Sequence, residues 1–420
     1  MRIILINHYA GSLVHGMEYR PYYLSREWVR LGNSVAIIAA SFSHLRERNP
    51  TFRGRLFREM IDGIEYLWVK SPSYFRNSLR RILNILAFSA RLHHALKTVS
   101  CGQKVDAIVA SSPHPFIVRA AHKAARQFGA KLVFEVRDLW PLSLVELGGM
   151  KPSHPFIRFM QRYEERALVE SDLVVSLLPC AKQYFVERGM SENKFRYVPN
   201  GFSVADRESS RDELPGPLRT AIEAIRSRSK MLVGYAGYFG IANALDTLIE
   251  VAGDLRDQRI GFALLGKGPE KGSLVRRAAE MGIDNVCFLE YVPRGAVPAF
   301  LEAMDCLYIG FRAESLYRFG VSPNKIFDYM MASKPIIWSI GACNNPVRDS
   351  ACGISIQPEN AAAARDAILK LAALGTEGRR RMGENGRAYA VTHHDYSVLA
   401  RDFLGILREG DTGERNGSAR

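Results

Sequence analysis

A chain of 420 residues is longer than a single hydrophobic core comfortably supports, which favours two domains. With 47% hydrophobic and 24% charged residues, the composition excludes a disordered or fibrous protein. The net charge of +14 indicates an anionic partner, either nucleic acid or a membrane face. The six cysteines form no Cys-x-x-Cys pair, so no zinc site is expected, and no apolar run reaches about 18 residues, so no membrane-spanning helix is expected.

The first half of the chain alternates short apolar stretches with helical ones. A strand is predicted over 2–7, followed by a helix over 18–31, and a second helix is predicted over 116–127. Further strands are predicted over 34–40, 107–111, 132–138, 173–178 and 195–201. Apolar strands separated by helices favour a parallel sheet that is covered on both faces. Residues 1–205 are therefore predicted to form a Rossmann-like N-terminal domain.

A basic amphipathic helix is predicted over 76–97. It carries five basic residues and no acidic one: Arg76, Arg80, Arg81, Arg91 and Lys97. Its apolar residues recur at helical spacing: Leu79, Ile82, Leu83, Ile85, Leu86 and Phe88. Such a helix can lie in an anionic membrane interface. It can equally be a surface helix that packs on its own sheet. Nucleic acid is not expected as a partner, because the basic residues do not interleave with aromatic ones and no binding motif occurs.

The second half of the chain repeats the alternation after a charged connection. Residues 203–230 lack strand character and are predicted to hold the connection and a short helix. Strands are predicted over 231–237, 260–265, 286–292, 306–311 and 335–340, with helices over 243–254 and 324–332. Residues 206–385 are predicted to form a second Rossmann-like domain. A helix over 386–408 is expected to pack back toward the N-terminal domain, and 409–420 is expected to be a disordered tail.

Two doubly wound domains of this kind are predicted to face one another across a crevice. Ligands of open α/β sheets bind outside the carboxyl ends of the strands, so the loops at those ends should carry the function. His114 and the pair Arg137-Asp138 each follow a predicted strand directly. From the residues alone, His114 can also be a structural hydrogen bonder, and Arg137-Asp138 a local ion pair. No G-x-G-x-x-G or P-loop motif occurs.

Four motifs of the second half recur in one order that is typical of a known family. They are "VGYAGYFGIANALDTLIEVA", "ALLGKGPEKGSL", "VCFLEYVPRGAVPAFLEAMDCLYIGF" and "GVSPNKIFDYMMASKPII". With them, the second half resembles the donor domain of retaining glycosyltransferases of the GT-B fold, family 4. The first half resembles the acceptor domain of a bacterial polysaccharide and O-antigen subgroup, through "YAGSLVHGMEYRPYYLSREWVRLGNSV", "FEVRDLWPLSLVELGGM" and "VPNGF".

The resemblance implies a donor site for a nucleoside diphosphate sugar. Asp328 would accept the ribose hydroxyls, and Lys325 would face the diphosphate beside a helix start, where free N–H groups bind anions. Where the family carries Glu, seven residues and Glu, this chain has Gly320 and Asp328. The resemblance further implies these donor-binding residues: Gly237, Tyr238, Phe239, Gly240, Lys267, Tyr291, Val292, Arg312, Gly320, Val321, Ser322, Pro323 and Asn324. Tyr238 and Asn243 stand where many members carry Arg and Lys, so Lys267, Arg312 and Lys325 are the expected cations.

The resemblance also implies the chemistry and the location. The reaction would transfer a hexosyl or N-acetylhexosaminyl group from a UDP-linked donor with retention, without metal or cofactor. The catalytic residues would be His114, which would hydrogen-bond a sugar hydroxyl, together with Lys325 and Asp328. The acceptor would be a lipid-diphosphate-linked sugar or an oligosaccharide, lined by Gly16, Glu18, Arg20, Arg137 and Asp138. The expected place is the cytoplasm, at the inner face of the plasma membrane.

Two other readings remain open at this point. UDP-sugar 2-epimerases share the two-domain fold, although their acidic and histidine residues do not map onto this sequence. The second hypothesis is a partner subunit that binds nucleotide sugars but has no activity. It is favoured by Gly320 and Tyr238, which depart from the residues of the family.

Overall fold

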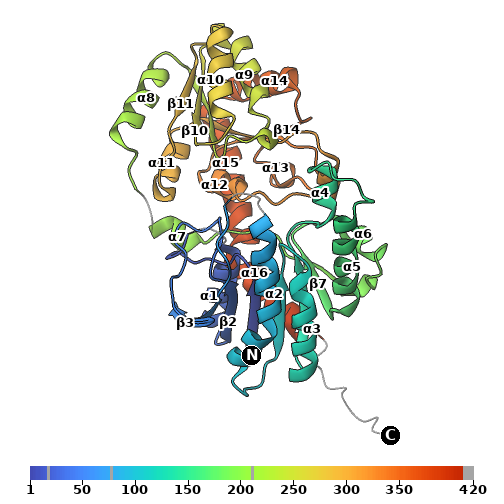
Figure 1. Cartoon of the computed structure of the whole chain (residues 1–420). Helices are drawn as coiled ribbons and strands as arrows, with labels where there is room; N and C mark the ends of the chain where they lie inside the picture. The colour runs from blue at the N-terminus through green and yellow to red at the C-terminus, as the bar shows by residue number, and fades with distance from the viewer. Residues whose placement is uncertain (17–18, 76–78, 210–211, 410–420) are drawn as a thin grey trace. The chain divides into compact units, whose positions relative to one another are not determined.

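The computed structural model describes residues 1–16, 19–75, 79–209 and 212–409. They form two compact units (Figure 1). The N-terminal unit comprises residues 1–201 and the described part of 396–420, and the C-terminal unit comprises residues 202–395. Each unit is built on a largely parallel sheet, which confirms the prediction of two Rossmann-like α/β domains. Arg76, Glu18 and residues 410–420 of the expected tail lie outside the described residues.

The N-terminal sheet has the strand order β3-β4-β2-β1-β5-β6-β7-β8. The strands are β1 (Arg2–Asn7), β2 (Ser34–Ala40), β3 (Leu56–Ile61), β4 (Ile64–Val69), β5 (Ala107–Ser111), β6 (Lys131–Val136), β7 (Leu173–Ser176) and β8 (Phe195–Tyr197). All neighbours are parallel except β3 and β4. The chain leaves the sheet on opposite sides of the β1–β5 pair, so the topological switch point lies at the carboxyl ends of these two strands.

The β3–β4 hairpin was not predicted from the sequence. Its two strands pair from Leu56 opposite Val69 to Ile61 opposite Ile64. Asp62 and Gly63 connect them with positive φ angles of 48° and 77°. Asp-Gly between two apolar runs is a strong signal for a two-residue hairpin turn, and it would have located these strands.

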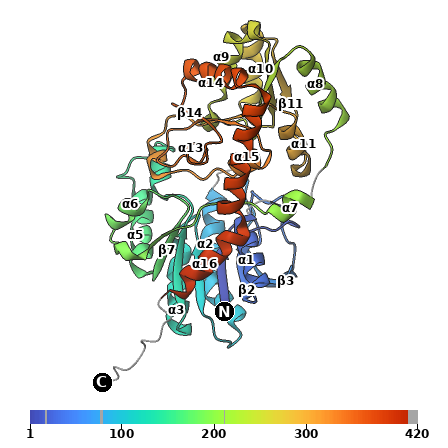
Figure 2. The ribbon, with the colours of Figure 1, turned by 180° about the vertical axis from the view of Figure 1, so that it is seen from behind.

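Helices cover both faces of the N-terminal sheet (Figures 1 and 2). On one face lie α2 (Leu79–Ser100), α3 (Phe116–Phe128) and α5 (Pro155–Glu170), and on the other lie α1 (Tyr19–Arg30) and α16 (Tyr396–Arg408). The short helices are α4 (Leu142–Glu146), η1 (Glu192–Lys194) and α6 (Lys182–Val186). The last helix is an integral part of this unit, because Phe403 is fully buried against the Trp28 ring and the Trp28 indole donates to the Ala400 carbonyl at 3.0 Å.

The C-terminal sheet is parallel throughout, with the order β11-β10-β9-β12-β13-β14. Its strands are β9 (Met231–Ala236), β10 (Ile260–Leu265), β11 (Val286–Leu289), β12 (Cys306–Gly310), β13 (Ile336–Ser339) and β14 (Gly353–Ile356). One face carries α9 (Leu245–Asp254), α10 (Lys271–Glu280) and α14 (Ala361–Ala373). The other carries α8 (Gly216–Ser227), α11 (Val297–Glu302), α12 (Lys325–Met331), α13 (Pro346–Asp349) and the end of α15 (Gly375–His394).

Short elements connect this framework, namely α7 (Val204–Ser209), η2 (Ile241–Asn243), η3 (Arg256–Gln258), η4 (Arg294–Ala296) and η5 (Ser315–Phe319). The stretch 203–230, expected to hold one short helix, holds α7 and α8. The C-terminal helix predicted over 386–408 is two helices, because the chain turns at Asp395, which forms a β-bridge with Phe202. Only α16 belongs to the N-terminal unit. The switch point of this sheet lies between β9 and β12.

A buried carboxyl joins α5 to α6 in the N-terminal unit. Glu164 is 1% exposed, and its Oε2 accepts from the Tyr184 hydroxyl at 3.0 Å and from the Gln161 amide at 3.1 Å. Its Oε1 is buried without a hydrogen-bond partner among the described residues, and Arg188 lies 3.7 Å from Oε2. Burial raises the pKa of this carboxyl from 4.5 to about 8.

Replacing Glu164 with Gln should therefore remove a pH-dependent loss of stability. A raised folded pKa means that the folded state holds the proton more tightly, so the stabilisation is full below pH 4.5 and is lost as the pH rises toward 8. The variant should match wild type near pH 5 and be more stable near pH 8.5, in chemical unfolding followed by circular dichroism. Glu165→Gln, one residue along and half-buried, is the control. A difference from wild type that is the same at both pH values would contradict the argument.

Candidate functional site

The candidate site of the C-terminal unit is formed by loops at the carboxyl ends of β9 to β12. The loops after β9 and β10 touch through their backbones. Gly237 N–H donates to the Leu265 carbonyl at 3.0 Å, and Phe239 N–H donates to the Lys267 carbonyl at 2.9 Å. A Cβ on Gly266 would lie 1.9 Å from the Gly237 carbonyl oxygen, and one on Gly268 would lie 2.3 Å from the Phe239 oxygen. Both glycines also have positive φ, so only glycine fits these two positions.

Lys325 places its amine beneath this pair of loops. Its Nζ donates to the Tyr235 hydroxyl at 3.2 Å and to the Asn243 side-chain oxygen at 2.5 Å. The amine also lies 4.8 Å from the centre of the Tyr235 ring and 5.6 Å from that of Phe311. Burial lowers the pKa of this amine to about 7. Within the described residues no carboxylate forms an ion pair with it, so a buried cation lacks an anionic partner.

Two other predicted cations of the site are already engaged. The Arg312 guanidinium donates to Asp246 at 2.9 Å and to Glu359 at 2.6 Å, so it ties the end of β12 to α9 and to the loop before α14. The Lys267 amine lies 4.1 Å from the centre of the Tyr291 ring. Tyr291 and Tyr238 are about half exposed, at 49% and 59%, and present aromatic surface at the edge of the site. A ligand contact of Arg312 or Lys267 stays a prediction.

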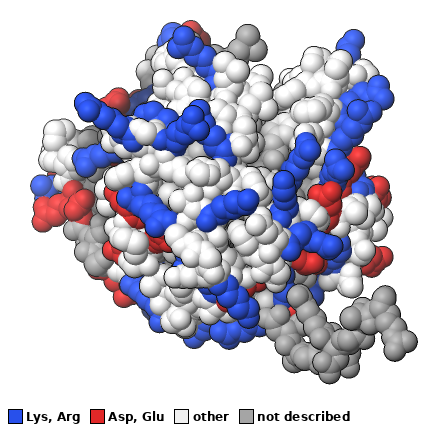
Figure 3. All heavy atoms as spheres, turned by 60° about the horizontal axis from the view of Figure 1, so that its bottom comes forward, with Lys and Arg blue, Asp and Glu red and all other residues white. Residues whose placement is uncertain are grey.

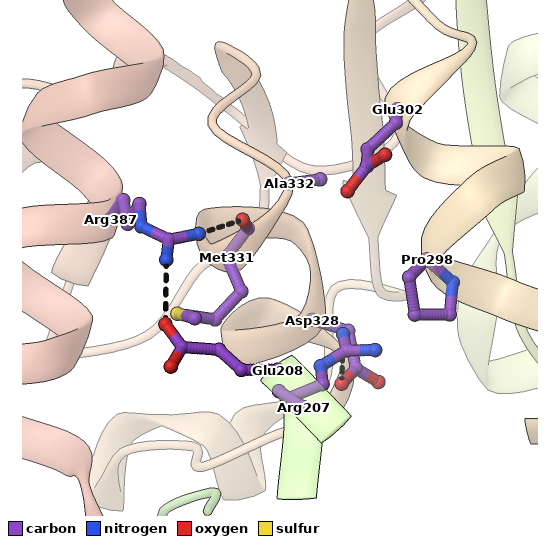
Figure 4. Close-up of a pocket in the computed structure, with 8 residues that line it drawn as sticks. All are labelled: Arg207, Glu208, Pro298, Glu302, Asp328, Met331, Ala332 and Arg387. Atoms are coloured by element: carbon purple, nitrogen blue, oxygen red, sulfur yellow. Dashed lines mark hydrogen bonds and ion pairs between the residues drawn. The ribbon is translucent and has the colours of Figure 1, made fainter. Parts of the chain in front are cut away.

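Asp328 lies on the first turn of α12, three residues after Lys325. Its Oδ1 forms an ion pair of 2.6 Å with Arg207 on α7. The two side chains are 28% and 14% exposed. They line a small hollow whose other walls are Glu208, Pro298, Glu302, Met331, Ala332 and Arg387 (Figure 4). The predicted ribose-binding carboxylate is therefore held by an arginine of its own unit.

The remaining predicted donor residues divide into core and loop positions. The side chains of Phe239, Val292 and Val321 are buried in the hydrophobic cores, so only their backbones can meet a ligand. Gly320 has a φ of 102° and begins the loop that leads through Ser322, Pro323 and the exposed Asn324 into α12. A Cβ on Gly240, the residue before η2, would lie 2.9 Å from the exposed Tyr238 ring. Tyr235 and Asn243 were not predicted as partners of Lys325. They are far from it in the sequence, and only the fold brings them together.

In the N-terminal unit, His114 lies at the switch point but is 1% exposed. Its Nε2 lies 3.1 Å from Nδ1 of His8, and Nε2 of His8 lies 2.5 Å from the Asn84 side-chain oxygen. Because that oxygen accepts, His8 donates through Nε2 and accepts through Nδ1, and His114 donates through Nε2. Nδ1 of His114 is then a buried acceptor without a partner among the described residues. Burial lowers the pKa of His114 to about 3, so the ring stays neutral.

Arg20 is the centre of a second buried network in this unit. Its Nε and Nη2 donate to Glu135 Oε1 at 3.1 and 3.0 Å, and Nη2 also donates to the Val198 carbonyl at 3.0 Å. Glu135 accepts from Ser111 at 2.5 Å. The ion pair is almost fully buried, with side chains 2% and 1% exposed, so its contacts join α1, β6 and the segment after β8. A contact of Arg20 with an acceptor stays a prediction.

The other predicted acceptor residues lie on loops. Gly16 has a φ of 70°, and a Cβ there would lie 2.9 Å from the Glu47 side chain. Arg137 is half-buried and its N–H donates to the Ser112 hydroxyl at 2.9 Å, while Asp138 is exposed. The structure thus places Gly16, Arg20, His114, Arg137 and Asp138 in the N-terminal unit, and Lys325 and Asp328 in the C-terminal unit.

The outward face of α2, α3 and α5 is basic and partly apolar. On α2, Arg80 is exposed beside Ile82, Leu83 and Leu86, which are 39%, 56% and 47% exposed, whereas Ile85 and Phe88 pack inward. Exposed basic residues continue on the two neighbouring helices: Arg119, Lys123 and Arg126 on α3, and Arg158, Arg162 and Arg166 on α5. Figure 3 shows Lys and Arg side chains spread over this side of the N-terminal unit. No helix of the described residues is long and apolar enough to cross a membrane.

The fold and two sequence families now define the class of protein. Residues 15–201 match the glycosyl transferase 4-like domain, and residues 230–373 match the glycosyl transferases group 1. With the two Rossmann-like units, these matches show that the chain is a glycosyltransferase of the GT-B type.

Three known proteins are similar to this chain. The putative colanic acid biosynthesis glycosyl transferase WcaI of Escherichia coli K12 is 25% identical over 310 residues, which are 70% of this chain and 75% of the relative. Sucrose-phosphate synthase from Thermosynechococcus elongatus superposes with a TM-score of 0.70 at 14% identity, over 97% of this chain and 98% of its own. Anabaena HepE, solved in complex with UDP, gives 0.64 at 15% identity, over 97% and 99%.

The glycine contact between the two loops can be tested directly. Gly266→Ala should lower the stability of the C-terminal unit by more than about 1 kcal/mol, because the methyl group would overlap the Gly237 carbonyl and the backbone has positive φ. Thermal unfolding would show the loss. Gly272→Ala in α10 is the matched control, since its nearest atom is 3.7 Å away and alanine favours a helix. A similar loss of thermal stability in both variants would contradict the importance of the close contact between Gly266 and the Gly237 carbonyl.

Proposed function

We propose that this glycosyltransferase takes its sugar from a nucleoside diphosphate sugar, transfers it with retention of configuration, and acts in the synthesis of a cell-surface polysaccharide. The observation that carries the proposal is the Lys325 amine, which is buried beneath the loops after β9 and β10 without a carboxylate partner in the described residues. A buried cation of this kind is stabilised by an anionic ligand. UDP is the proposed nucleotide, since the structure of Anabaena HepE holds UDP.

In this proposal Lys325 binds the diphosphate and acts in the transition state. Negative charge grows on the leaving diphosphate as the glycosidic bond breaks, and a fixed cation in a site with little water stabilises that charge. The backbone N–H groups of 238–240 and 322–324 are the proposed neutral donors to the same group. No metal or cofactor is proposed.

Asp328 is proposed to accept the ribose hydroxyls. One of its oxygens bonds to Arg207, and a carboxylate offers about four lone pairs, so acceptor sites remain for a ligand. His114 is proposed to accept a hydrogen bond from a sugar hydroxyl through Nδ1, which is the free acceptor of its neutral ring.

The proposed acceptor is a sugar linked through a diphosphate to a lipid, and the proposed place of action is the inner face of the plasma membrane. Support for the acceptor class comes from the similarity to a protein named for colanic acid biosynthesis. Support for the membrane comes from the exposed Ile82, Leu83 and Leu86 of α2, which adjoin a face rich in arginine and lysine.

The donor site can be tested by calorimetric titration of UDP. Lys325→Ala and Asp328→Asn should each weaken binding by about 10- to 150-fold, which corresponds to roughly 1.5 to 3 kcal/mol for hydrogen bonds to charged groups. Lysine binds the diphosphate only when protonated, so wild-type affinity should fall as the pH rises through 7, while that of Lys325→Ala should not. Comparing the two proteins cancels the titration of UDP itself.

Lys230→Ala is the control for this experiment, because Lys230 is exposed at the amino end of β9, away from the site loops. Equal UDP affinities in wild type and in both site variants would show that the donor site lies elsewhere.

The membrane surface can be tested by sedimentation with vesicles of phosphatidylglycerol and phosphatidylcholine. Changing Arg80, Arg119 and Lys123 together to Gln should release the protein, since each basic residue near an anionic surface contributes about 1 kcal/mol. Leu83→Ser with Leu86→Ser should also weaken binding, through lost apolar burial.

The matched control removes the same net charge from exposed positions of the C-terminal unit, with Arg219, Lys230 and Arg276 changed to Gln. If both triple variants lose binding equally, net charge alone is responsible. If neither loses it, the proposal of an anionic membrane partner fails.

A further inference from the structure

We infer that Arg207 is a positioning residue that holds the Asp328 carboxylate in the orientation that binds the ribose of the donor. This inference rests on the proposed function, in which Asp328 accepts the ribose hydroxyls. The carrying observation is the 2.6 Å ion pair between Arg207 on α7 and Asp328 on α12 (Figure 4).

The α7 segment has anchors of its own that do not involve Arg207. Phe202, just before α7, stacks on Phe327 with ring centres 6.0 Å apart, and its N–H donates to the His394 carbonyl at 3.0 Å. After Arg207, Glu208 accepts from Arg387 on α15 at 3.2 Å. Arg387 also donates to the carbonyl of Met331, at the end of α12, at 3.2 Å. These contacts fix α7 against α12 without the Arg207 side chain.

The Arg207 guanidinium is costly as a purely structural group. Its side chain is 14% exposed, and its Nε is buried without a hydrogen-bond partner among the described residues. A buried ion pair can often be replaced as a whole by apolar residues at little or no loss of stability, so such a pair is weak evidence for a purely structural role. Since α7 is already anchored, the structure points to a role of Arg207 toward the carboxylate that it contacts.

The contact between Arg207 and Asp328 is suited to orienting the carboxylate and does not block its access to a ribose. Arg207 engages Oδ1, and the Asp328 side chain keeps 28% of its surface exposed. Without the arginine, a partly exposed aspartate would rotate freely and would lose entropy when it bound the ribose. A fixed carboxylate avoids this loss, so Arg207 should raise affinity for ligands that carry the ribose hydroxyls and for no others.

The test compares UDP with 2′-deoxyuridine diphosphate by calorimetric titration, and the ratio of the two affinities measures recognition of the 2′-hydroxyl. Arg207→Gln should lower this ratio by about three- to tenfold, as expected for a partly exposed charged partner, and should weaken binding of the deoxy compound, which keeps only the 3′-hydroxyl, by less than it weakens binding of UDP. Arg207→Lys should restore part of the ratio. In an Asp328→Asn background, Arg207→Gln should have no further effect, because it acts only through that carboxylate.

Arg219→Gln is the control, because it removes an exposed arginine of α8 and should keep the wild-type ratio. If Arg207→Gln keeps the wild-type ratio while Asp328→Asn lowers it, the ribose role stands and the positioning role of Arg207 is wrong. If Arg207→Gln strengthens UDP binding, the arginine competes with the ribose, which also overturns the inference. If Asp328→Asn leaves the ratio unchanged, the proposed ribose role itself fails.

Discussion

The contact between the loops after β9 and β10 shapes the surroundings of the buried Lys325 amine in the candidate site. Gly237 and Gly266 meet so closely that neither loop has room for a side chain between them. This contact buries Phe239 and holds the Tyr235 hydroxyl under the loop, where it donates to the Tyr238 carbonyl at 2.8 Å. Lys325 reaches the same hydroxyl from α12 and loses water in doing so. Burial under these elements lowers the pKa of its amine.

A loop with Gly, Ser and Pro that leads into a helix is a local pattern, so the sequence could single out Lys325 and Asp328 as candidates, and their roles stay predictions. The sequence could not show how deeply Lys325 is buried, since this burial depends on Tyr235 of β9 and on Phe311, the residue after β12. Asn243 was taken as the replacement of a basic residue, and in the structure it is the acceptor for Lys325. Arg312 was taken as a candidate cation, and only the fold shows that Asp246 and Glu359 neutralise it.

The fold was predictable where the signal is local. Apolar runs separated by helices were sufficient for both parallel sheets, and the Asp62-Gly63 turn would have been sufficient for the hairpin that was not predicted. The end of α15 was not predictable in this way. Neither Gly nor Pro comes directly after His394, and the chain turns at Asp395, where Phe202 bridges to it from a distant part of the sequence. The pair of α7 with α12 through Arg207 has the same non-local origin.

The buried polar groups of the two units are of two kinds. Some have all their hydrogen-bond and ion-pair partners within the described residues, and others do not. Arg20 with Glu135, and Arg312 with Asp246 and Glu359, are neutralised and hydrogen-bonded, so they hold elements of the fold together. Among the described residues, the buried His114 ring keeps an acceptor without a hydrogen-bond partner, and the buried Lys325 amine has no carboxylate partner. An incomplete buried group costs free energy in the folded protein, and a ligand that completes it recovers that cost on binding. His114 and Lys325 both lie near the switch point of their sheet, where doubly wound proteins bind their ligands, so at these two places the cost can serve function.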